Sequence, residues 1–368
     1  MMRIEGHAPA KLNLTLEVLG RRADGYHEVA SVMHTLSLCD TLTLELPPPE
    51  RLDPARGAIH IIEPSDSPPL REAIPTDSRN LVWQAVDRFW EMLHLPPSLR
   101  FPPLREGNRE LGLPRPHGMD SPLHEGNQPP SVPPASRGNL KEGVRKQTVA
   151  WRATLTKRIP SQAGLGGGSS DAACALRLLN HWAARYERAL PDDALHTLAS
   201  ELGADVAFFL NGGCALATGR GEHLHPLPTL PPFWWVLAKP YGVGVPTGWA
   251  YAQLQRGTVS PTARADHTER LARLLPTIRT PRDLAPLLHN DFDAPILQAI
   301  PPLAKLRTLL EQGGTLRVIL CGSGAAQAAL CESEAHAKAL AQMLIQQNYW
   351  AVWARMYWVN TSLTAGTP

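Results

Sequence analysis

A glycine-rich stretch near the middle of the chain, residues 157–171, constrains the fold more than any other segment. Before it, from Trp151 to Ile159, apolar and polar residues alternate, which predicts a β-strand. After it, apolar residues recur at spacings of four and three, which predicts one face of an amphipathic helix: Ala172, Leu176, Leu179, Ala183 and Tyr186. The sequence therefore predicts a strand–loop–helix unit with glycines at its turn.

The composition of this loop suits a bound anion. Glycine permits positive φ and lets backbone N–H groups come close to a ligand, and a helix start adds unpaired N–H donors and a partial positive charge. Ser169 and Ser170 are predicted to cap the helix. Together these features predict a phosphate site, formed by Gly164, Leu165, Gly166, Gly167, Gly168, Ser169 and Ser170.

Two well-known nucleotide-binding loops do not match this stretch. No Gly-Lys-Ser/Thr sequence ends the loop, which excludes the Walker P-loop. Gly164 and Gly166 match the first two glycines of a dinucleotide fingerprint, but Ser169 stands in the place of the third. A lone glycine-rich turn is more often a simple turn than a ligand site. Here the coincidence of four glycines, two hydroxyls and a strand–helix context favours phosphate.

The composition limits the class of protein. With 368 residues the chain is expected to form two domains, and 43% hydrophobic and 19% charged residues are typical of a soluble globular protein. A net charge of +2 gives no reason to expect a nucleic-acid or membrane partner. The chain has no stretch of about 18 apolar residues and no apolar run near Met1, so we predict neither a membrane span nor a signal peptide.

The cysteines favour a reducing compartment. They are scattered, odd in number and free of any Cys-x-x-Cys pair, which disfavours a disulfide framework and a zinc site: Cys39, Cys174, Cys214, Cys321 and Cys331. We therefore expect a cytoplasmic protein. The sequence leaves the oligomeric state open between a monomer and a homodimer.

The first 95 residues are predicted to contain strands and then a helix. From residue 8 to 18, apolar residues alternate with polar ones, and a second alternating run covers residues 41–46. Between them lies a turn, residues 20–25. Residues 79–95 are predicted to form a helix, with Leu81, Ala85, Phe89 and Met92 on one face.

Between this helix and the glycine-rich unit the periodicity disappears. Eleven prolines fall within the 39 residues from 96 to 134, mixed with glycines. Residues 97–147 are therefore predicted to form a long disordered or loosely held loop. We expect a tolerated surface insertion, because lengthening a loop adds little entropic cost; a linker and a partner-binding segment are the alternatives.

The remaining chain is predicted to continue as a mixture of helices and strands. A helix over residues 192–202 should end at Gly203, and a strand should cover 214–218. A new unit begins near 233 with a strand, followed by helical stretches near 283–300 and 301–312 and a strand over 317–320. The turn at 321–325 is expected to lead into a helix ending near Gln347, and 350–357 is a last strand. This order predicts an α+β sandwich.

Several segments resemble the three motifs of the GHMP kinases. Residues 159–173 resemble the second motif, and residues 8–14 with 20–28 resemble the first. The pair Tyr26-His27 resembles the first motif of one branch of the family. The acceptor of that branch is 4-diphosphocytidyl-2-C-methyl-D-erythritol, in the non-mevalonate route to isoprenoid precursors. Residues 322–324, Gly-Ser-Gly, resemble the third motif, although Cys321 and Ala325 replace its usual Ser and Pro. This departure puts in question the geometry of that loop and its hydrogen bonds to phosphate.

The resemblance covers about residues 8–95 and 148–357, and it implies an α+β fold of two domains. An N-terminal ATP-binding domain, similar to the second domain of ribosomal protein S5, would cover residues 1–228 and carry the insertion 97–147. A ferredoxin-like C-terminal domain would cover 229–358, followed by a tail, 359–368.

The resemblance also implies the site residues. Lys11 and Asp205 would be the catalytic pair, with Asp205 as the base; Asp171 is a weaker choice. Periodicity alone would leave Lys11 a surface lysine and Asp205 a turn residue. Asn13, Tyr26, His27 and Thr247 would bind the acceptor, whereas Asn80 and Lys157 would lie on the adenine side of ATP. The hydroxyl of Ser170 would be available to Mg²⁺.

The predicted function is therefore an ATP- and Mg²⁺-dependent small-molecule kinase. The small-molecule partner would be the cytidine diphosphate-linked methylerythritol. A GHMP kinase acting on homoserine or mevalonate is the alternative within the family, and Tyr26-His27 argue against it. A catalytically silent ligand-binding protein is disfavoured because Lys11 and Asp205 are both present. An NAD-dependent oxidoreductase is disfavoured by the spacing of the loop.

Overall fold

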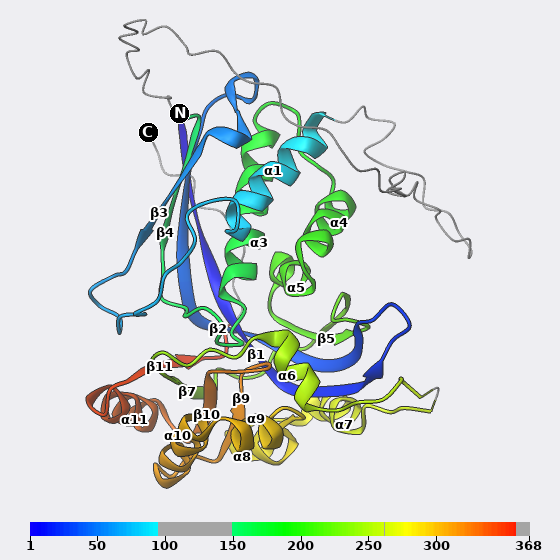
Figure 1. The fold of residues 1–368 in the computed structure, drawn as a ribbon, viewed down its shortest axis with the longest axis vertical. Helices are drawn as coiled ribbons and strands as arrows, with labels where there is room; N and C mark the ends of the chain where they lie inside the picture. Colours follow the sequence, from blue (N-terminus) through cyan, green and yellow to red (C-terminus); the bar gives the residue numbers. More distant parts are fainter. Residues whose placement is uncertain (95–148, 261, 358–368) are drawn as a thin grey trace, which may run out of the picture.

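The computed structural model describes residues 1–94, 149–260 and 262–357, and it contains two β-sheets with helices packed on them (Figure 1). The predicted α+β class is confirmed. The predicted insertion 97–147 and tail 359–368 lie outside the described residues. Within the described residues, none of the helices combines the length and the apolar character that a membrane span requires.

The larger sheet is built around a long hairpin. Strands β1 (Met2–Arg21) and β2 (His27–Leu46) pair antiparallel along almost their whole length, and Gly25 at φ +87° helps to turn the chain between them. The order is β3-β4-β2-β1-β8, and β5 pairs with both β2 and β6. The other strands are β3 (Gly57–Ile62), β4 (Trp151–Thr156), β5 (Cys214–Thr218), β6 (His223–Leu227) and β8 (His289–Asn290).

A β-bulge in β1 changes which side chains face the interior. The register of β1 against β2 shifts between Asn13 and Thr15, and a bulge of this kind re-aims the residues that follow it. Thr15 therefore contacts Thr268 instead of continuing the face of Lys11 and Asn13. The alternation in the sequence correctly predicts the strand, but it does not predict that the side chains change face at the bulge.

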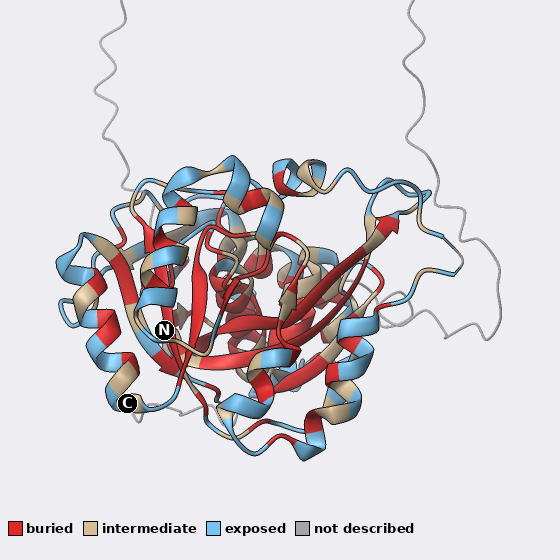
Figure 2. Ribbon diagram, turned by 90° about the horizontal axis from the view of Figure 1, so that it is seen from below, coloured by how far each residue is buried: buried red, intermediate tan, exposed pale blue. Residues whose placement is uncertain are grey.

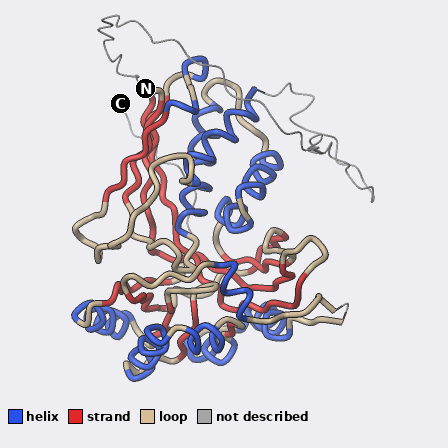
Figure 3. The backbone as a smooth tube through the Cα atoms, viewed as in Figure 1, coloured by secondary structure: helices blue, strands red, loops and turns tan. Residues whose placement is uncertain are grey.

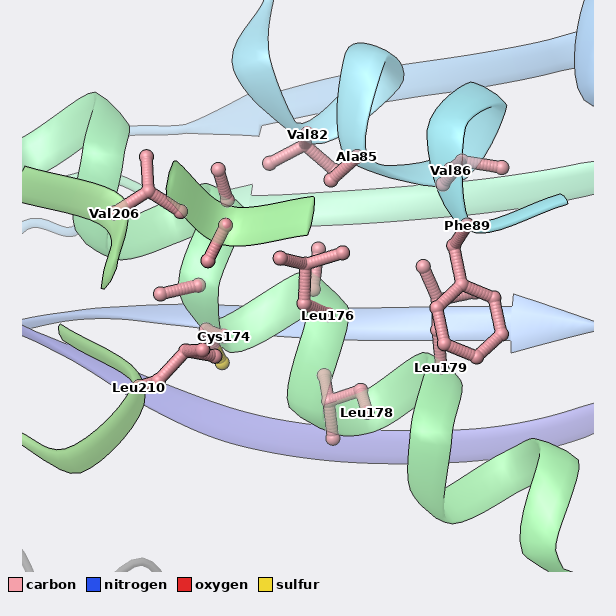
Figure 4. Packing of buried hydrophobic residues seen from close by; sticks show 14 of the residues in the cluster. Val82, Ala85, Val86, Phe89, Cys174, Leu176, Leu178, Leu179, Val206 and Leu210 are labelled. Atoms are coloured by element: carbon pink, nitrogen blue, oxygen red, sulfur yellow. The ribbon is translucent and has the colours of Figure 1, made fainter. Parts of the chain in front are cut away.

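Four helices cover one face of the larger sheet (Figure 1). They are α1 (Leu81–His94), α3 (Gly167–Ala184), α4 (Asp192–Leu202) and α5 (Ala204–Asn211). The buried face of α1 carries Val82, Val86 and Leu93, whereas the predicted Leu81 and Met92 are only half-buried. Figure 4 shows Val82, Ala85, Val86 and Phe89 opposite side chains of α3 such as Leu176 and Leu179. This packing holds the glycine-rich loop at the start of α3.

The second sheet lies below the first in Figure 1 and has four antiparallel strands in the order β11-β7-β10-β9. They are β7 (Trp234–Pro240), β9 (Arg317–Leu320), β10 (Gln327–Cys331) and β11 (Tyr349–Arg355). Its helices include α8 (Pro281–Leu284), α9 (Asp293–Ala299), α10 (Pro301–Gln312) and α11 (Glu334–Gln346). Figure 2 shows buried residues concentrated in the strands and exposed ones on the outer helices, and Figure 3 shows the two layers of strands.

Two predictions for the C-terminal half are wrong. The turn at 321–325 leads into strand β10, and the helix α11 begins only at Glu334. All five residues of β10 are buried and four of them are apolar, so no alternation of apolar and polar residues marks the strand. The helical stretch expected near 283–300 is divided by β8, because His289 and Asn290 pair in parallel with Thr15 and Leu16 of β1.

The chain after residue 229 contributes to both sheets. Besides β8, helix α7 (Asp266–Leu274) joins the N-terminal hairpin, since the Thr268 N–H donates to Glu17 (2.8 Å) and its hydroxyl donates to Thr15 Oγ1 (3.0 Å). Helix α6 (Thr247–Gln253) lies beside α9. We propose the division at 228/229 as a boundary in the chain rather than as a separation of two independent bodies.

His34 makes the folded protein sensitive to acid. Its Nδ1 lies 2.8 Å from Thr35 O and its Nε2 lies 3.4 Å from Leu230 N, which fits a neutral ring that donates through Nδ1 and accepts at Nε2. Burial lowers the pKa of His34 to about 4, whereas an unfolded histidine has a pKa of about 6.5. Between these values the unfolded chain binds more protons, so stability falls as the pH is lowered.

We expect His34→Gln to remove this part of the pH dependence, because glutamine can donate and accept without titrating. Lowering the pH from 7 to 4 should cost the wild type about 3 kcal/mol more free energy of unfolding than the variant. Urea unfolding at several pH values measures the difference. The exposed His223→Gln serves as control, and parallel pH profiles for wild type and His34→Gln would contradict the prediction.

Candidate active site

A cavity of about 360 Å³ lies where the two sheets meet. Its walls come from β1, β2, the glycine-rich loop, the first turn of α5, the β5–β6 turn, the start of α6 and the turn at 322–323. Seven predicted residues from distant parts of the chain line it: Lys11, Asn13, Gly164, Gly166, Ser169, Asp205 and Thr247. A larger cavity of about 970 Å³ lies against β2 and α11, and none of the predicted site residues lines it.

The glycine-rich loop presents the start of α3 to this cavity. Helix α3 begins at Gly167, and the preceding Gly166 is left-handed at φ +73°. The first intrahelical bond runs from Ser170 N to Gly166 O at 2.9 Å, so the N–H groups before Ser170 are those that a helix start leaves without an intrahelical partner. The prediction that Ser169 and Ser170 cap α3 is wrong, because both lie inside its first turn.

Gly164 marks a close approach between the loop and the C-terminal unit. Its φ is +75°, and a Cβ there would lie 1.6 Å from Cys321 O. The same two segments are joined by hydrogen bonds from Ala325 N to Gln162 O (3.0 Å) and from Ala326 N to Ala163 O (3.1 Å). Residues 321–326 thus support the glycine-rich loop, although Cys321 stands in the place of the first Ser of the usual third motif and Ala325 in the place of its Pro.

We expect Gly164→Ala to lower the free energy of unfolding by roughly 2–5 kcal/mol, because it adds about 1–2 kcal/mol of backbone strain and about 1–3 kcal/mol of overpacking. Urea denaturation measures the loss. Gly248→Ala is the control, since Gly248 lies in α6 with nothing within 4 Å of an added Cβ. Equal stability of the two variants would mean that the backbone near Cys321 moves aside freely.

Lys11 and Asp205 meet inside the cavity. Lys11 Nζ lies 3.6 Å from Asp205 Oδ2, and it also donates a hydrogen bond of 2.6 Å to Asn13 Oδ1. Asn13 in turn donates to Ser31 Oγ at 2.8 Å. The ammonium group is therefore held in place, since Lys11 and Asn13 are buried while the Asp205 side chain keeps 38% of its surface exposed.

The segment before Asp205 explains its position. Helix α4 ends at Leu202, as predicted, and α5 begins at Ala204 after the single residue Gly203. Asp205 falls in the first turn of α5, where a carboxylate is favoured by the helix dipole. The five apolar residues that follow it, 206–210, are buried, so α5 is anchored while its first turn faces the cavity.

Tyr26 and His27 lie beside the cavity and do not line it. The His27 ring stacks on that of Tyr251 with centroids 4.7 Å apart, and Tyr251 does line the cavity. Tyr26 is 57% exposed and lies under the guanidinium of Arg220, 4.9 Å from its ring centroid. Burial, helped by the charge of Arg21, lowers the pKa of His27 below its ordinary value, and burial raises the pKa of Tyr251 to about 12.

Tyr251 is a residue that the sequence analysis missed. It lies in helix α6, one turn after Thr247. Residues four apart share a helix face, so the position of Thr247 contained a signal for it. Arg220 was missed as well, because a lone arginine in a Gly-Arg-Gly turn resembles any surface residue.

Lys157 and Asn80 lie outside the cavity. Lys157 is buried and donates to Asp40 Oδ2 and, at 2.6 Å, to Asp171 Oδ2. Burial alone would lower the pKa of Lys157, but the two carboxylates raise it above its ordinary value, and burial raises the pKa of Asp171. Since a Cβ at Gly167 would lie 3.5 Å from Lys157 Nζ, this charged triad supports the loop from beneath. Asn80 accepts from Val82 N at 2.9 Å, which is the geometry of a helix cap.

The residues around the loop fit a magnesium ion that is held mainly by phosphate. Ser170 Oγ is buried and finds no hydrogen-bond partner among the described residues. The described part of the chain holds no cluster of three or more His, Cys, Asp or Glu side chains suited to a metal. Mg²⁺ in nucleotide sites commonly takes one or two protein ligands and completes its shell with phosphates and water, so a site with few protein oxygens is compatible with it.

Known proteins resemble this chain along most of its length. Residues 138–213 match the GHMP kinases N terminal domain, and residues 271–349 match the GHMP kinases C terminal family. Two proteins named 4-diphosphocytidyl-2-C-methyl-D-erythritol kinase, from Gloeobacter violaceus and a Synechocystis species, are each 33% identical to it. The alignments cover 94% and 90% of this chain and 91% and 88% of those proteins.

Solved structures agree with these relatives. A crystal structure titled 4-(cytidine 5'-diphospho)-2C-methyl-D-erythritol kinase superposes with a TM-score of 0.61 at 29% identity, and the match covers 98% of this chain and 100% of that chain. A homoserine kinase from Cytophaga hutchinsonii superposes with a TM-score of 0.59 at 16% identity, covering 99% and 98% of the two chains. At that identity the second similarity concerns the fold alone.

Proposed function

The chain belongs to the GHMP kinases, in the branch of the 4-diphosphocytidyl-2-C-methyl-D-erythritol kinases, and from this premise we propose that it transfers the γ-phosphoryl group of ATP to the 2-hydroxyl of that acceptor. The reaction belongs to the non-mevalonate route to isoprenoid precursors. The observation that carries the proposal is the Lys11–Asp205 pair, 3.6 Å apart, in a cavity that also holds the glycine-rich loop.

Asp205 is proposed as the general base. Its exposed carboxylate accepts the proton of the acceptor hydroxyl as the oxygen attacks the γ-phosphorus, and the bond from phosphorus to the β,γ-bridging oxygen breaks to release ADP. Lys11 is held by Asn13, so its ammonium group is already oriented toward the charge that develops on the attacking oxygen and the transferred group. Asp171, the weaker choice of base, already accepts a hydrogen bond from Lys157.

The glycine-rich loop is proposed as the phosphate cradle for ATP. Backbone N–H groups at the start of α3 and the hydroxyl of Ser169, which lines the cavity, would contact phosphate oxygens. Ser170 Oγ, buried and without a partner among the described residues, is the proposed protein ligand of Mg²⁺. When bound, the ion would neutralise charge on the phosphates. Asn80 and Lys157 would act indirectly, by fixing α1 and the loop on the adenine side.

The acceptor is proposed to lie on the side of Tyr251 and Thr247. Tyr251 and His27 provide an aromatic pair, and stacking on an aromatic ring suits a nucleobase. Asn13 faces the same cavity and lies next to Lys11, near the reacting hydroxyl. The same fold serves homoserine and mevalonate kinases, whose acceptors have no base to stack. We also propose that the enzyme works in the cytoplasm as a monomer or homodimer.

The decisive measurement is ADP release, coupled to NADH oxidation, with ATP, Mg²⁺ and the cytidyl acceptor. We expect turnover with this acceptor and rates at least a hundredfold lower with homoserine or mevalonate, because neither provides a base or a diphosphate to bind. Preference for one of those two acceptors would replace the proposed substrate. No turnover with any acceptor would support a silent binding protein instead.

A further inference from the structure

Arg220 stands at the tip of the β5–β6 hairpin, at the edge of the cavity. Two left-handed glycines flank it, Gly219 at φ +75° and Gly221 at φ +108°. The turn is held by bonds from Gly219 N to Glu28 Oε1 (3.1 Å) and from Gly221 N to Thr218 O (3.1 Å). Both Arg220 and Gly221 line the cavity that contains Lys11 and Asp205.

The hairpin tip also touches the helix that carries the proposed base. A Cβ on Gly221 would lie 3.4 Å from the Cβ of Ala204, the residue before Asp205. The tip of the hairpin and the first turn of α5 therefore form one continuous wall. Arg220 is thus placed on the same side of the cavity as Asp205, with Tyr26 on its other flank.

The guanidinium of Arg220 is held in one orientation, but its terminal N–H groups remain available to a ligand. Its Nε lies 3.3 Å from Glu222 Oε1, and its planar face covers the ring of Tyr26. Neither terminal nitrogen makes a hydrogen bond to any residue in the described ranges. A guanidinium held at Nε and stacked on a ring presents its two terminal N–H edges in a fixed direction, which suits bidentate contact with phosphate.

The other charged residues of the cavity leave contact with the phosphates of the acceptor unassigned. Its charged lining residues are Lys11, Asp205 and Arg220. Lys11 is engaged by Asn13 and Asp205, on the path of the transferred phosphoryl group. A nucleoside diphosphate-linked acceptor brings about two further negative charges, which cost free energy to desolvate unless a cation meets them. Arg220 is the remaining cation of this lining.

We propose that Arg220 binds the diphosphate of the acceptor and so selects nucleoside diphosphate-linked alcohols over uncharged ones. The inference rests on the proposed function and adds to it a specificity residue that neither the motifs nor the sequence analysis identified. Tyr26 then supports the guanidinium from below, which gives this exposed tyrosine a positioning role.

The test compares wild type, Arg220→Gln and Arg220→Lys in steady-state assays with ATP and the cytidyl acceptor. Since charged hydrogen bonds contribute about 1.5–3 kcal/mol, we expect Arg220→Gln to raise the KM for the acceptor by roughly tenfold to a hundredfold, while the KM for ATP stays within about twofold. Arg220→Lys should recover part of the loss. Arg152→Gln, on the exposed surface of β4 with Glu45 at 3.9 Å as its salt-bridge partner, is the matched control.

Binding of cytidine and of CDP separates phosphate contact from base contact. By titration calorimetry, wild type should bind CDP more tightly than cytidine, and Arg220→Gln should lose most of that difference. An equal weakening of both ligands would mean that Arg220 acts through Tyr26 on the base, and it would overturn the proposal. If the wild type is active and Arg220→Gln leaves the KM for the acceptor unchanged, the proposal is also overturned. Absence of turnover and of CDP binding in the wild type would instead reject the proposed function, and this inference with it.

Discussion

Replacing Asp205 with asparagine is expected to lower kcat with the cytidyl acceptor by roughly a hundredfold to ten-thousandfold, the contribution usual for a general base. Asparagine keeps the shape of the side chain but cannot take the proton of the attacking hydroxyl. The carboxylate is partly exposed, and Lys11 is held independently by Asn13, so the fold and the position of the lysine should survive. Coupled ADP release measures the loss.

The control for this variant is Asp193→Asn, in the first turn of α4. It removes one carboxylate from an exposed helix start and should keep kcat within about twofold, as surface substitutions usually do. Lys11→Ala should also reduce turnover by about a hundredfold or more. Undiminished kcat in both Asp205→Asn and Lys11→Ala would reject the assigned pair, and loss of helical circular dichroism would reveal a folding defect instead.

Replacing Lys157 with methionine is expected to lower the free energy of unfolding by about 3–5 kcal/mol. Without its ammonium group, the buried carboxylates Asp40 and Asp171 would face each other without a counter-charge. Urea denaturation at pH 8 measures the change. Lys338→Met is the matched control, because Lys338 is half exposed and pairs with Glu334 one helical turn away at 2.8 Å; it should cost about 0.5 kcal/mol or less.

The pH dependence of Lys157→Met distinguishes lost charge from lost packing. Without the lysine, burial and repulsion by the charge of Asp40 would hold the pKa of the Asp171 carboxyl above its unfolded value of about 4. The folded variant would then bind more protons than the unfolded chain, so its stability should rise as the pH is lowered from 8 toward 5. A loss of stability that is equal at pH 8 and pH 5 would point to packing alone.

The sequence predicted most strongly those elements whose pattern is local. The strand–loop–helix unit, the helix that stops at Gly203 and the N-terminal strands are confirmed, because periodicity and glycine stops act over a few residues. Strand β10 was missed because it is buried on both faces and therefore has no alternation. The bulge after Asn13 was missed because it depends on pairing with β2 rather than on the residues of β1 themselves.

The candidate site shows the same difference between features with a local sequence signal and features that depend on distant residues. Lys11, Asp205 and the loop were recognisable as motifs, and the fold brings them to one cavity. Asp40 had no such signal, although it accepts from Ile159 N at 3.0 Å and contacts Lys157. Its partners lie more than a hundred residues away in the chain. Periodicity and spacing carry no information about a contact of that range.

The close approach of Gly164 to Cys321 affects the stage of synthesis at which a growing chain can first bind nucleotide. The loop takes its shape against residues 321–326, which leave the ribosome about 160 residues after Gly164. A nascent chain that ends before Ala326 contains every residue of the phosphate loop but lacks the backbone that braces it. Nucleotide binding should therefore begin late in synthesis, when the C-terminal sheet has docked, and partial chains should not compete for ATP.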